Sequence, residues 1–161
     1  MEEKIETSKE NIIRAFNNAD DKGKQFLKNL YPDLNLTNDI TREIRSARDA
    51  FERTGVYYDL WFLEMKRKDL TSQEINRRIL EKIALVLNEG WIPNWKDSNQ
   101  QKFYPWFTYD KEVGGFVFSN TLCDCTHTYS DLGSRLYFRT RKLAEYAGKT
   151  FLYEYIQMMK Y

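Results

Sequence analysis

The chain's organisation follows from residues 71–90, which read TSQEINRRILEKIALVLNEG. Thr71, with Glu74 three residues later, is typical of a helix N-terminus, and Gly90 is typical of a helix end. Between them apolar residues recur at helical spacing, namely Ile75, Ile79, Ile83, Val86 and Leu87. The apolar arc is wide, so the sequence predicts a central helix over these residues.

Before this stretch the sequence predicts shorter helices. The first runs from Ser8 to about Asn17, with Ser8 as its cap, and residues 20–23 break it. The second contains Phe26, Leu27 and Leu30. It stops before Pro32, because the residue before a proline disfavours helical geometry.

A third candidate helix starts near Thr41 or Ser46 and ends at Gly55. Ser46 and Asp49, three residues apart, resemble a capping box. The sequence pattern of residues 56–68 does not decide their secondary structure.

After Gly90 the chain is rich in aromatic residues: eight of the 25 lie in residues 1–90 and 17 follow. Residues 102–109 are β-prone and include Pro105, which favours an edge strand because proline lacks a backbone donor. Residues 110–115 supply a turn and 116–118 a returning strand. The pattern therefore predicts a β-hairpin.

Residues 135–139 predict a third strand, in which Leu136 and Phe138 form an apolar face. The opposite face is then basic and aromatic, with Arg135, Tyr137 and Arg139. After Thr140 one long helix is expected, and its Gly148 lets the helix approach the sheet closely.

The predicted fold class is α+β. Residues 1–90 form an N-terminal helical region, and residues 91–161 form an aromatic-rich unit of hairpin, third strand and long C-terminal helix. We expect the helical region to pack with the small antiparallel sheet, of about three strands, around one shared core.

Composition excludes several classes of protein. The 25 basic and 24 acidic residues give a net charge of +1, and 42% hydrophobic residues suffice for a packed core. No apolar run approaches the roughly 18 to 20 residues that span a bilayer. The N-terminal residues Glu2, Glu3, Glu6 and Glu10 leave no apolar segment for a secretory signal. We expect an intracellular protein of one domain, with or without a small appended subdomain, that does not span a membrane and has no membrane partner.

A family resemblance is carried by four segments: Asn88-Glu89-Gly90-Trp91-Ile92-Pro93-Asn94-Trp95, Tyr104-Pro105-Trp106-Phe107, Gly133-Ser134-Arg135-Leu136 and Leu143-Ala144-Glu145-Tyr146-Ala147-Gly148-Lys149. Through them the chain resembles an uncharacterised protein family encoded by phages and prophages of Bacteroidetes. The resemblance covers roughly residues 40–155 and is strongest from Asn88 onward. It implies a phage or mobile-element accessory protein, cytoplasmic in the host cell or associated with the virion, and it implies no catalytic residues.

Two cysteines and the single histidine lie close together, at Cys123, Cys125 and His127. They are weak candidates for a metal site, because a structural zinc needs four ligands and this cluster offers at most three. The family pattern lacks cysteines in this loop, which argues against a shared metal role. We favour a polar loop with free thiols, since a disulfide between positions two apart would be strained. No cofactor is expected.

Catalysis has little support in the sequence. Gly148-Lys149-Thr150 matches the tail of a phosphate-binding loop, but Leu143 stands where that motif needs glycine. A nucleophile and base pair would have to use His127, and none of the many carboxylates is marked by its context. An enzyme is therefore less favoured than a binding protein.

The candidate binding residues lie after Gly90. Four cations fall within eight residues, at Arg135, Arg139, Arg141 and Lys142, with Tyr137 among them. Such a surface suits single-stranded nucleic acid, through phosphate neutralisation and base stacking. However, residues 73–161 hold 12 basic and 10 acidic residues, far from a strongly basic domain. Trp95 and Trp106 are further candidates, although core packing is the commoner role of such side chains.

Two hypotheses remain open. The first, which we favour, is a non-enzymatic accessory protein that binds a host or phage protein or forms a homo-oligomer, since arginine and aromatic residues are enriched at protein interfaces. The second is a single-stranded nucleic-acid-binding accessory protein that uses the cations and Tyr137 of residues 135–142. If Arg135 and Arg139 are covered or paired with acids, the second hypothesis loses its site.

Overall fold

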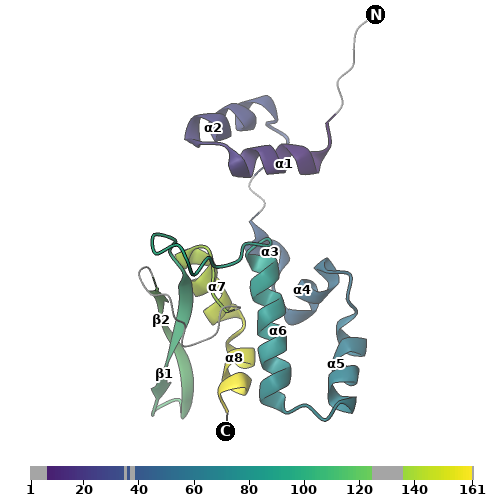
Figure 1. Cartoon of the computed structure of the whole chain (residues 1–161), viewed down its shortest axis with the longest axis vertical. Helices are drawn as coiled ribbons and strands as arrows, with labels where there is room; N and C mark the ends of the chain where they lie inside the picture. The colour runs from purple at the N-terminus through teal and green to yellow at the C-terminus, as the bar shows by residue number, and fades with distance from the viewer. Residues whose placement is uncertain (1–6, 35, 37–38, 125–135, 161) are drawn as a thin grey trace, which may run out of the picture. The chain divides into compact units, whose positions relative to one another are not determined.

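The computed structural model describes residues 7–34, 36, 39–124 and 136–160. The chain forms two compact units, Met1–Asp39 and Ile40–Tyr161. The expected regional boundary near Gly90 therefore lies inside the second unit. Each unit is described by itself (Figure 1).

The first unit is a pair of helices, α1 (Lys9–Asn18) and α2 (Asp21–Leu30). The Ser8 hydroxyl accepts the Asn11 N–H at 3.3 Å, as the sequence predicts for the first helix. α1 ends at Asn18, and Asp20 caps the start of α2, since its carboxylate accepts the Gly23 N–H at 2.8 Å. The small core of this unit consists of Ile12, Phe16 and Leu36.

The second unit has helices at both ends of its sequence and a hairpin between them. In chain order its elements are α3 (Ile40–Glu43), α4 (Ala47–Arg53), α5 (Tyr58–Arg67), α6 (Ser72–Leu87), β1 (Phe103–Asp110), β2 (Gly115–Cys123), α7 (Arg141–Thr150) and α8 (Leu152–Met159). The hairpin lies on one side, α7 and α8 lie between it and α6, and α4 and α5 lie beyond α6 (Figure 1). The predicted α+β class is confirmed.

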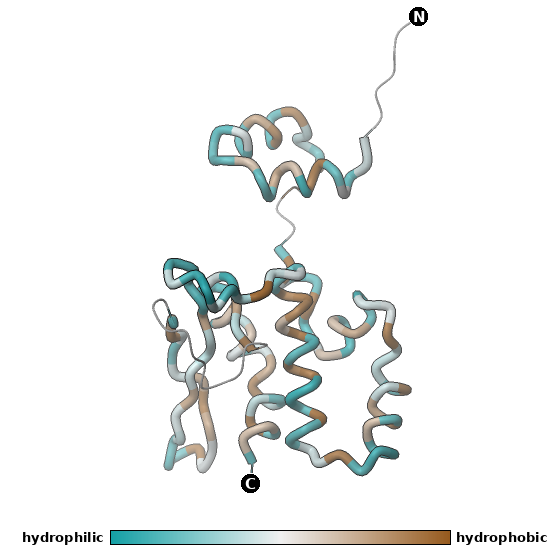
Figure 2. The backbone as a smooth tube through the Cα atoms, viewed as in Figure 1, coloured by the Kyte–Doolittle hydropathy of each residue, from teal (hydrophilic) through white to brown (hydrophobic). Residues whose placement is uncertain are grey.

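The central helix forms as the sequence predicts. Thr71 and Glu74 complete a capping box, in which the Thr71 N–H donates to the Glu74 carboxylate at 2.9 Å. The helix ends where Glu89 and Gly90 take positive φ angles of 51° and 82°. A positive φ angle is uncommon for a residue with a Cβ, such as Glu89, but it is readily adopted by glycine, so Gly90 is well suited to the end of the helix. Hydrophobic segments recur along α6 (Figure 2).

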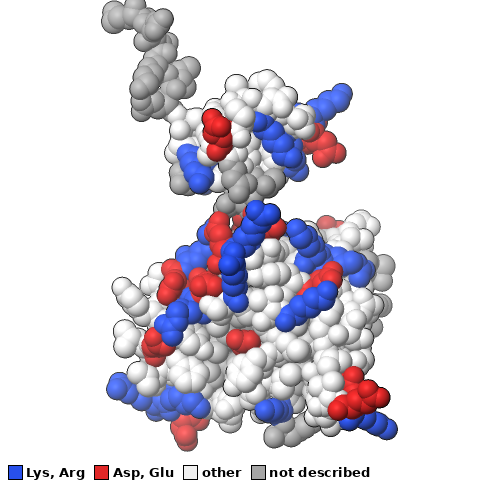
Figure 3. Space-filling model, turned by 180° about the vertical axis from the view of Figure 1, so that it is seen from behind, with Lys and Arg blue, Asp and Glu red and all other residues white. Residues whose placement is uncertain are grey.

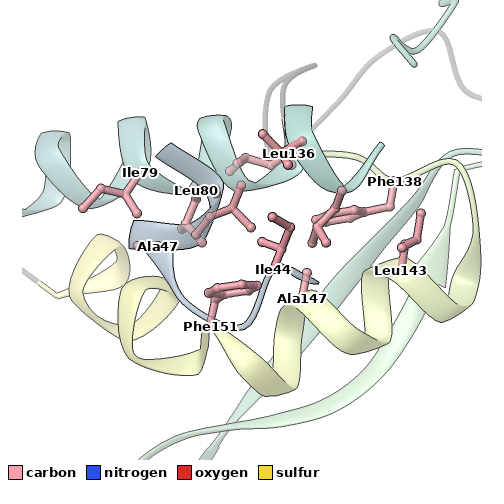
Figure 4. Close-up of a cluster of buried hydrophobic side chains, with 14 of the residues drawn as sticks. Ile44, Ala47, Ile79, Leu80, Leu136, Phe138, Leu143, Ala147 and Phe151 are labelled. Atoms are coloured by element: carbon pink, nitrogen blue, oxygen red, sulfur yellow. The ribbon is translucent and has the colours of Figure 1, made fainter. Parts of the chain in front are cut away.

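One core joins the helices of the second unit to its hairpin. It includes residues on both sides of Gly90, from Ile40 to Tyr155. In Figure 4, Ile79 and Leu80 of α6 face Ala147 and Phe151 across the cluster. The capping box of Ser46 and Asp49, which starts α4, is also as predicted.

The predicted hairpin is confirmed. β1 and β2 pair antiparallel, from Phe103 opposite Cys123 to Asp110 opposite Gly115, with an irregularity between Trp106 and Phe107. Among the described residues these two strands form the whole sheet, so Pro105 does lie in an edge strand.

The expected third strand is reduced, over the described residues 136–138, to one isolated bridge between Phe138 and Phe103. The expected alternation is also wrong, since Leu136, Tyr137 and Phe138 are all at most 3% exposed. Tyr137 is covered because the rings of Trp95 and Tyr104 each meet its ring edge-on, with centroids 5.2 Å apart. Alternating exposure requires a solvent-facing side, which this segment lacks.

The expected long C-terminal helix is two helices, α7 and α8, which meet at Phe151. Phe151 has φ −109° and ψ 30°, outside helical geometry, and its side chain is 1% exposed. The close approach at Gly148 is confirmed: a Cβ there would lie 2.5 Å from Phe118 Cδ2 and 2.7 Å from Pro105 Cβ. Gly148-Lys149-Thr150 lies within α7 and resembles a phosphate loop in letters alone.

Candidate functional site

A cleft of about 490 Å³ lies beside α6, with no residue of α7 or α8 in its described lining, and we call it the α6 groove. It is lined by residues of three helices and two further segments: Phe51, Trp61, Arg78, Glu81, Lys82, Leu85, Asn88, Trp91, Ile92, Pro93 and Tyr137. Most of these side chains are aromatic or aliphatic. Such a lining is typical of binding sites.

Helical periodicity places the α6 residues in the groove. Arg78, Lys82 and Leu85 are three and four residues apart, so they share one face of the helix. The buried residues of α6, such as Ile79 and Ile83, occupy the opposite face. The same helix therefore contributes one face to the core and the other to the groove. Because the core residues hold α6 in place, they also position the side chains that line the groove.

The floor of the groove is aromatic and closely packed. Phe51 is fully buried, and its ring lies 4.6 Å from that of Trp61 and 5.2 Å from that of Tyr58, centroid to centroid. Tyr137 completes the floor, and its hydroxyl donates to the Asp124 carboxylate at 2.6 Å. Edge-to-face contacts of this kind stabilise aromatic clusters beyond their burial.

Asn88 is the buried polar residue of the lining and is 3% exposed. Its Nδ2 donates to the Tyr137 carbonyl at 2.7 Å, and its Oδ1 accepts the Arg139 N–H at 3.0 Å. These bonds join the end of α6 to residues 137–139. The sequence analysis did not predict this role. The available signal was that Asn88 follows directly after the apolar residues Val86 and Leu87 at the end of the helix.

Charges lie along one part of the groove. Lys82 Nζ lies 5.7 Å from the centre of the Phe51 ring, and Arg78 is exposed. The carboxylate of the lining, Glu81, is 3.4 Å from Arg77 Nε. The lining therefore carries two cations and one carboxylate, and this carboxylate is ion-paired with Arg77, which lies outside the lining.

A bidentate ion pair connects the two helices that supply Phe51 and Trp61. Arg48 of α4 donates to both carboxylate oxygens of Asp59 of α5, at 2.6 and 2.7 Å. These hydrogen bonds lower the pKa of Asp59 below its usual range. Both side chains are more than half exposed, so the pair orients the helices more than it stabilises them.

The basic residues predicted to bind do not form one exposed surface. Tyr137 is 1% exposed, and Arg139 is ion-paired with Glu89. Arg141 donates to the Thr121 carbonyl and lies 5.4 Å from the Phe103 ring, whereas Lys142 is exposed. Arg135 lies outside the described residues. On the face shown in Figure 3, positive and negative side chains of the second unit are interspersed.

Trp95 and Trp106 lie outside the groove lining. Trp95 packs against Tyr137, and the Nζ of the buried Lys102 lies 5.4 Å from its ring. Lys102 Nζ also donates to the Asp97 and Gln100 carbonyls, at 3.1 and 2.7 Å. Trp95 therefore packs against Tyr137 of the groove floor without lining the groove. Trp106 lies in β1, outside the groove lining, and is 47% exposed.

The metal candidates are only partly described. Cys123 is disulfide-bonded, which contradicts the expected free thiol, and Cys125 and His127 lie outside the described residues. Within the described ranges no three His, Cys, Asp or Glu side chains come together as a metal site.

Comparisons with known proteins add no relative: no family model, curated protein or solved structure matches the chain. In the part of the chain that the structure describes, no helix has the length and apolar character needed to cross a bilayer.

Proposed function

We propose that this chain acts without catalysis, by binding a protein partner through the α6 groove. The observation that carries the proposal is the groove itself, a cleft of about 490 Å³ with a buried aromatic floor. Deep aromatic pockets on rigid elements are where protein interfaces concentrate their binding energy.

The rim of the groove favours a protein over a small ligand. Leu85 and Ile92 line the cleft yet remain 46% and 72% exposed. A small molecule in the cleft would contact these side chains on the side that faces the cleft, whereas a protein surface would also cover the parts that extend beyond it. Apolar side chains gathered at a cleft mouth are typical of interaction sites.

The chemistry of the lining supports binding rather than catalysis. Its carboxylate is paired with Arg77, and the hydroxyl of Tyr137 is held by Asp124. Both hydrogen-bonding groups of Asn88 are used by the backbone. The described lining thus offers no base within reach of a nucleophile, an arrangement that most acid–base and acyl-transfer sites need.

The resemblance to a phage and prophage family supports a host or phage protein as the partner, and self-association is the other protein outcome. The nucleic-acid hypothesis receives no support from the described basic residues, since Arg139 and Arg141 are engaged within the fold.

Affinity capture from host or infected-cell lysate, with and without nuclease, tests the proposal. Ile92→Asp places a charge at the rim of the groove, and Val113→Asp changes a side chain of similar exposure, 69%, in the hairpin turn. We expect the unaltered chain and Val113→Asp to retain the same protein after nuclease treatment and Ile92→Asp to lose it. Capture that nuclease abolishes, or that Ile92→Asp leaves intact, would contradict the proposal.

A further inference from the structure

The two parts of the α6 groove differ in chemistry. Toward the N-terminal end of its lined face, α6 supplies Arg78 and Lys82. Toward the other end the lining is apolar, with Leu85, Ile92 and Pro93. An occupant therefore meets cations at one end and an apolar wall at the other.

The carboxylates close to this cationic end are already engaged. Glu81 is paired with Arg77. Glu74, one helical turn before Arg78, accepts the Thr71 N–H and hydroxyl at 2.9 and 2.8 Å in the capping box. Glu74 keeps its charge, and Arg78 helps to lower its pKa. Among the described residues of this part of α6, the cations Arg77, Arg78 and Lys82 still outnumber the carboxylates Glu74 and Glu81 by one, so this end of the groove keeps a net positive charge.

We propose that the α6 groove recognises an acidic, hydrophobic peptide segment of its protein partner. This inference rests on the proposed function and names the chemistry of the partner. An aliphatic or aromatic side chain lies against Leu85, Trp91 and Ile92, and a nearby carboxylate is bound by Arg78 and Lys82. Complementary charge at a groove rim supplies specificity and association rate more than raw affinity.

Helix geometry sets the spacing between the two features. At a rise of about 1.5 Å per residue, Lys82 and Arg78 lie roughly 4.5 and 10 Å from Leu85 along the axis of α6. An extended peptide advances about 3.3 Å per residue. The carboxylate is therefore expected one to three residues from the apolar anchor.

The same features disfavour a nucleic-acid occupant. Single-stranded nucleic acid needs a cationic track along its backbone and aromatic faces for its bases. This groove offers two cations, and much of its rim is aliphatic, with Leu85, Ile92 and Pro93.

Matched peptides test the inference. We would use nine-residue peptides with a central Leu or Phe, and with Glu, Gln or Lys at the positions two residues to either side. Binding is followed by the indole N–H resonances of Trp61 and Trp91, which line the groove. We expect the Glu peptides to bind about tenfold more tightly than the Gln peptides, and the Lys peptides most weakly. The preference should shrink with added salt.

Charge reversal makes the test independent of any one peptide. Arg78→Glu with Lys82→Glu should transfer the preference to the Lys peptides. The matched control, Arg67→Glu with Lys111→Glu, reverses two exposed cations outside the groove and should change nothing. The unfolding midpoint of each variant shows whether it is folded. A milder double variant, Arg78→Gln with Lys82→Gln, neutralises the two cations without reversing their charge and should remove the preference for Glu peptides.

The outcomes separate the inference from the proposed function. Equal binding of the three peptide classes, or binding of none, would overturn the acidic preference; the proposed function would still stand if Ile92→Asp abolished nuclease-resistant capture. If a single-stranded oligothymidylate displaced the Glu peptides and bound more tightly, both would fall.

Discussion

One side of α6 is buried: Ile79, Leu80 and Ile83 are at most 2% exposed and belong to the core shared with α7 and α8. On the other side of the helix, the Leu85 side chain is 46% exposed. Both faces contain apolar residues, but among the described residues only the first face is closed by packing within the chain. The difference suggests that the closed face supplies stability and that the open face is available to a partner. Each prediction below probes one side of that comparison.

The largest effect is expected from a matched pair on α6. Leu80→Ala should lower the free energy of unfolding by about 3 kcal/mol, because it opens a cavity at a position that is 1% exposed. Leu85→Ala, on the groove face, should cost less than about 1 kcal/mol. Urea unfolding measures both. Similar losses in the two variants would refute the distinction between closed and open faces.

Gly148→Ala should be the next most damaging change, at about 2 kcal/mol, because its Cβ would overlap Phe118 and Pro105. An ordinary helical glycine would instead gain up to about 1 kcal/mol from the same substitution. Thermal unfolding distinguishes the signs. Phe118→Ala in the same chain should relieve part of the loss, and stabilisation by Gly148→Ala alone would disprove the close contact.

Asn88→Ala tests the link between α6 and the floor of the groove. Loss of its bonds leaves the Tyr137 carbonyl and the Arg139 N–H without their partner, so we expect a cost of about 1 to 2 kcal/mol. Asn76→Ala is the control on the same helix, because the Asn76 side chain bonds only to the exposed Ser72 carbonyl. Denaturant unfolding should show a clear loss for Asn88→Ala alone.

The smallest effect concerns Glu154 of α8. Burial raises the pKa of Glu154, so stability from this carboxyl is complete below its unfolded pKa, about 4.5, and is lost as pH rises through the folded pKa. Glu154→Gln should therefore stabilise the protein slightly at pH 7 and have little effect at pH 4.

Glu145→Gln is the opposite control for the pH series. A hydrogen bond from Lys149 lowers the pKa of Glu145, so its contribution is present at neutral pH and is lost as pH falls. This variant should lose a little stability at pH 7. The same sign for both variants at neutral pH would contradict the burial of Glu154.

Local rules predicted much of the fold. The capping boxes of Ser46 with Asp49 and Thr71 with Glu74, the hairpin and the close approach at Gly148 depend on residue types at fixed spacing. The break at Phe151 was not predictable in this way, because the apolar stripe continues across it. Burial of the Phe151 ring in the shared core accompanies the change of direction.

The candidate site could not be predicted to the same extent. Alternation placed Tyr137 on an exposed face, but Trp95 and Tyr104, distant in sequence, cover it. The groove likewise combines Phe51, Lys82 and Ile92 from different segments. Their proximity depends on tertiary packing, which periodicity within one segment does not report.

The most direct test of the account combines two readouts on Ile92→Asp, nuclease-resistant partner capture and the urea unfolding midpoint. Ile92 is 72% exposed, so the account predicts that capture is lost while the midpoint stays within the error of the unaltered chain. Retained capture would contradict a partner site at the α6 groove, and a large fall in the midpoint would contradict the claim that this face is open.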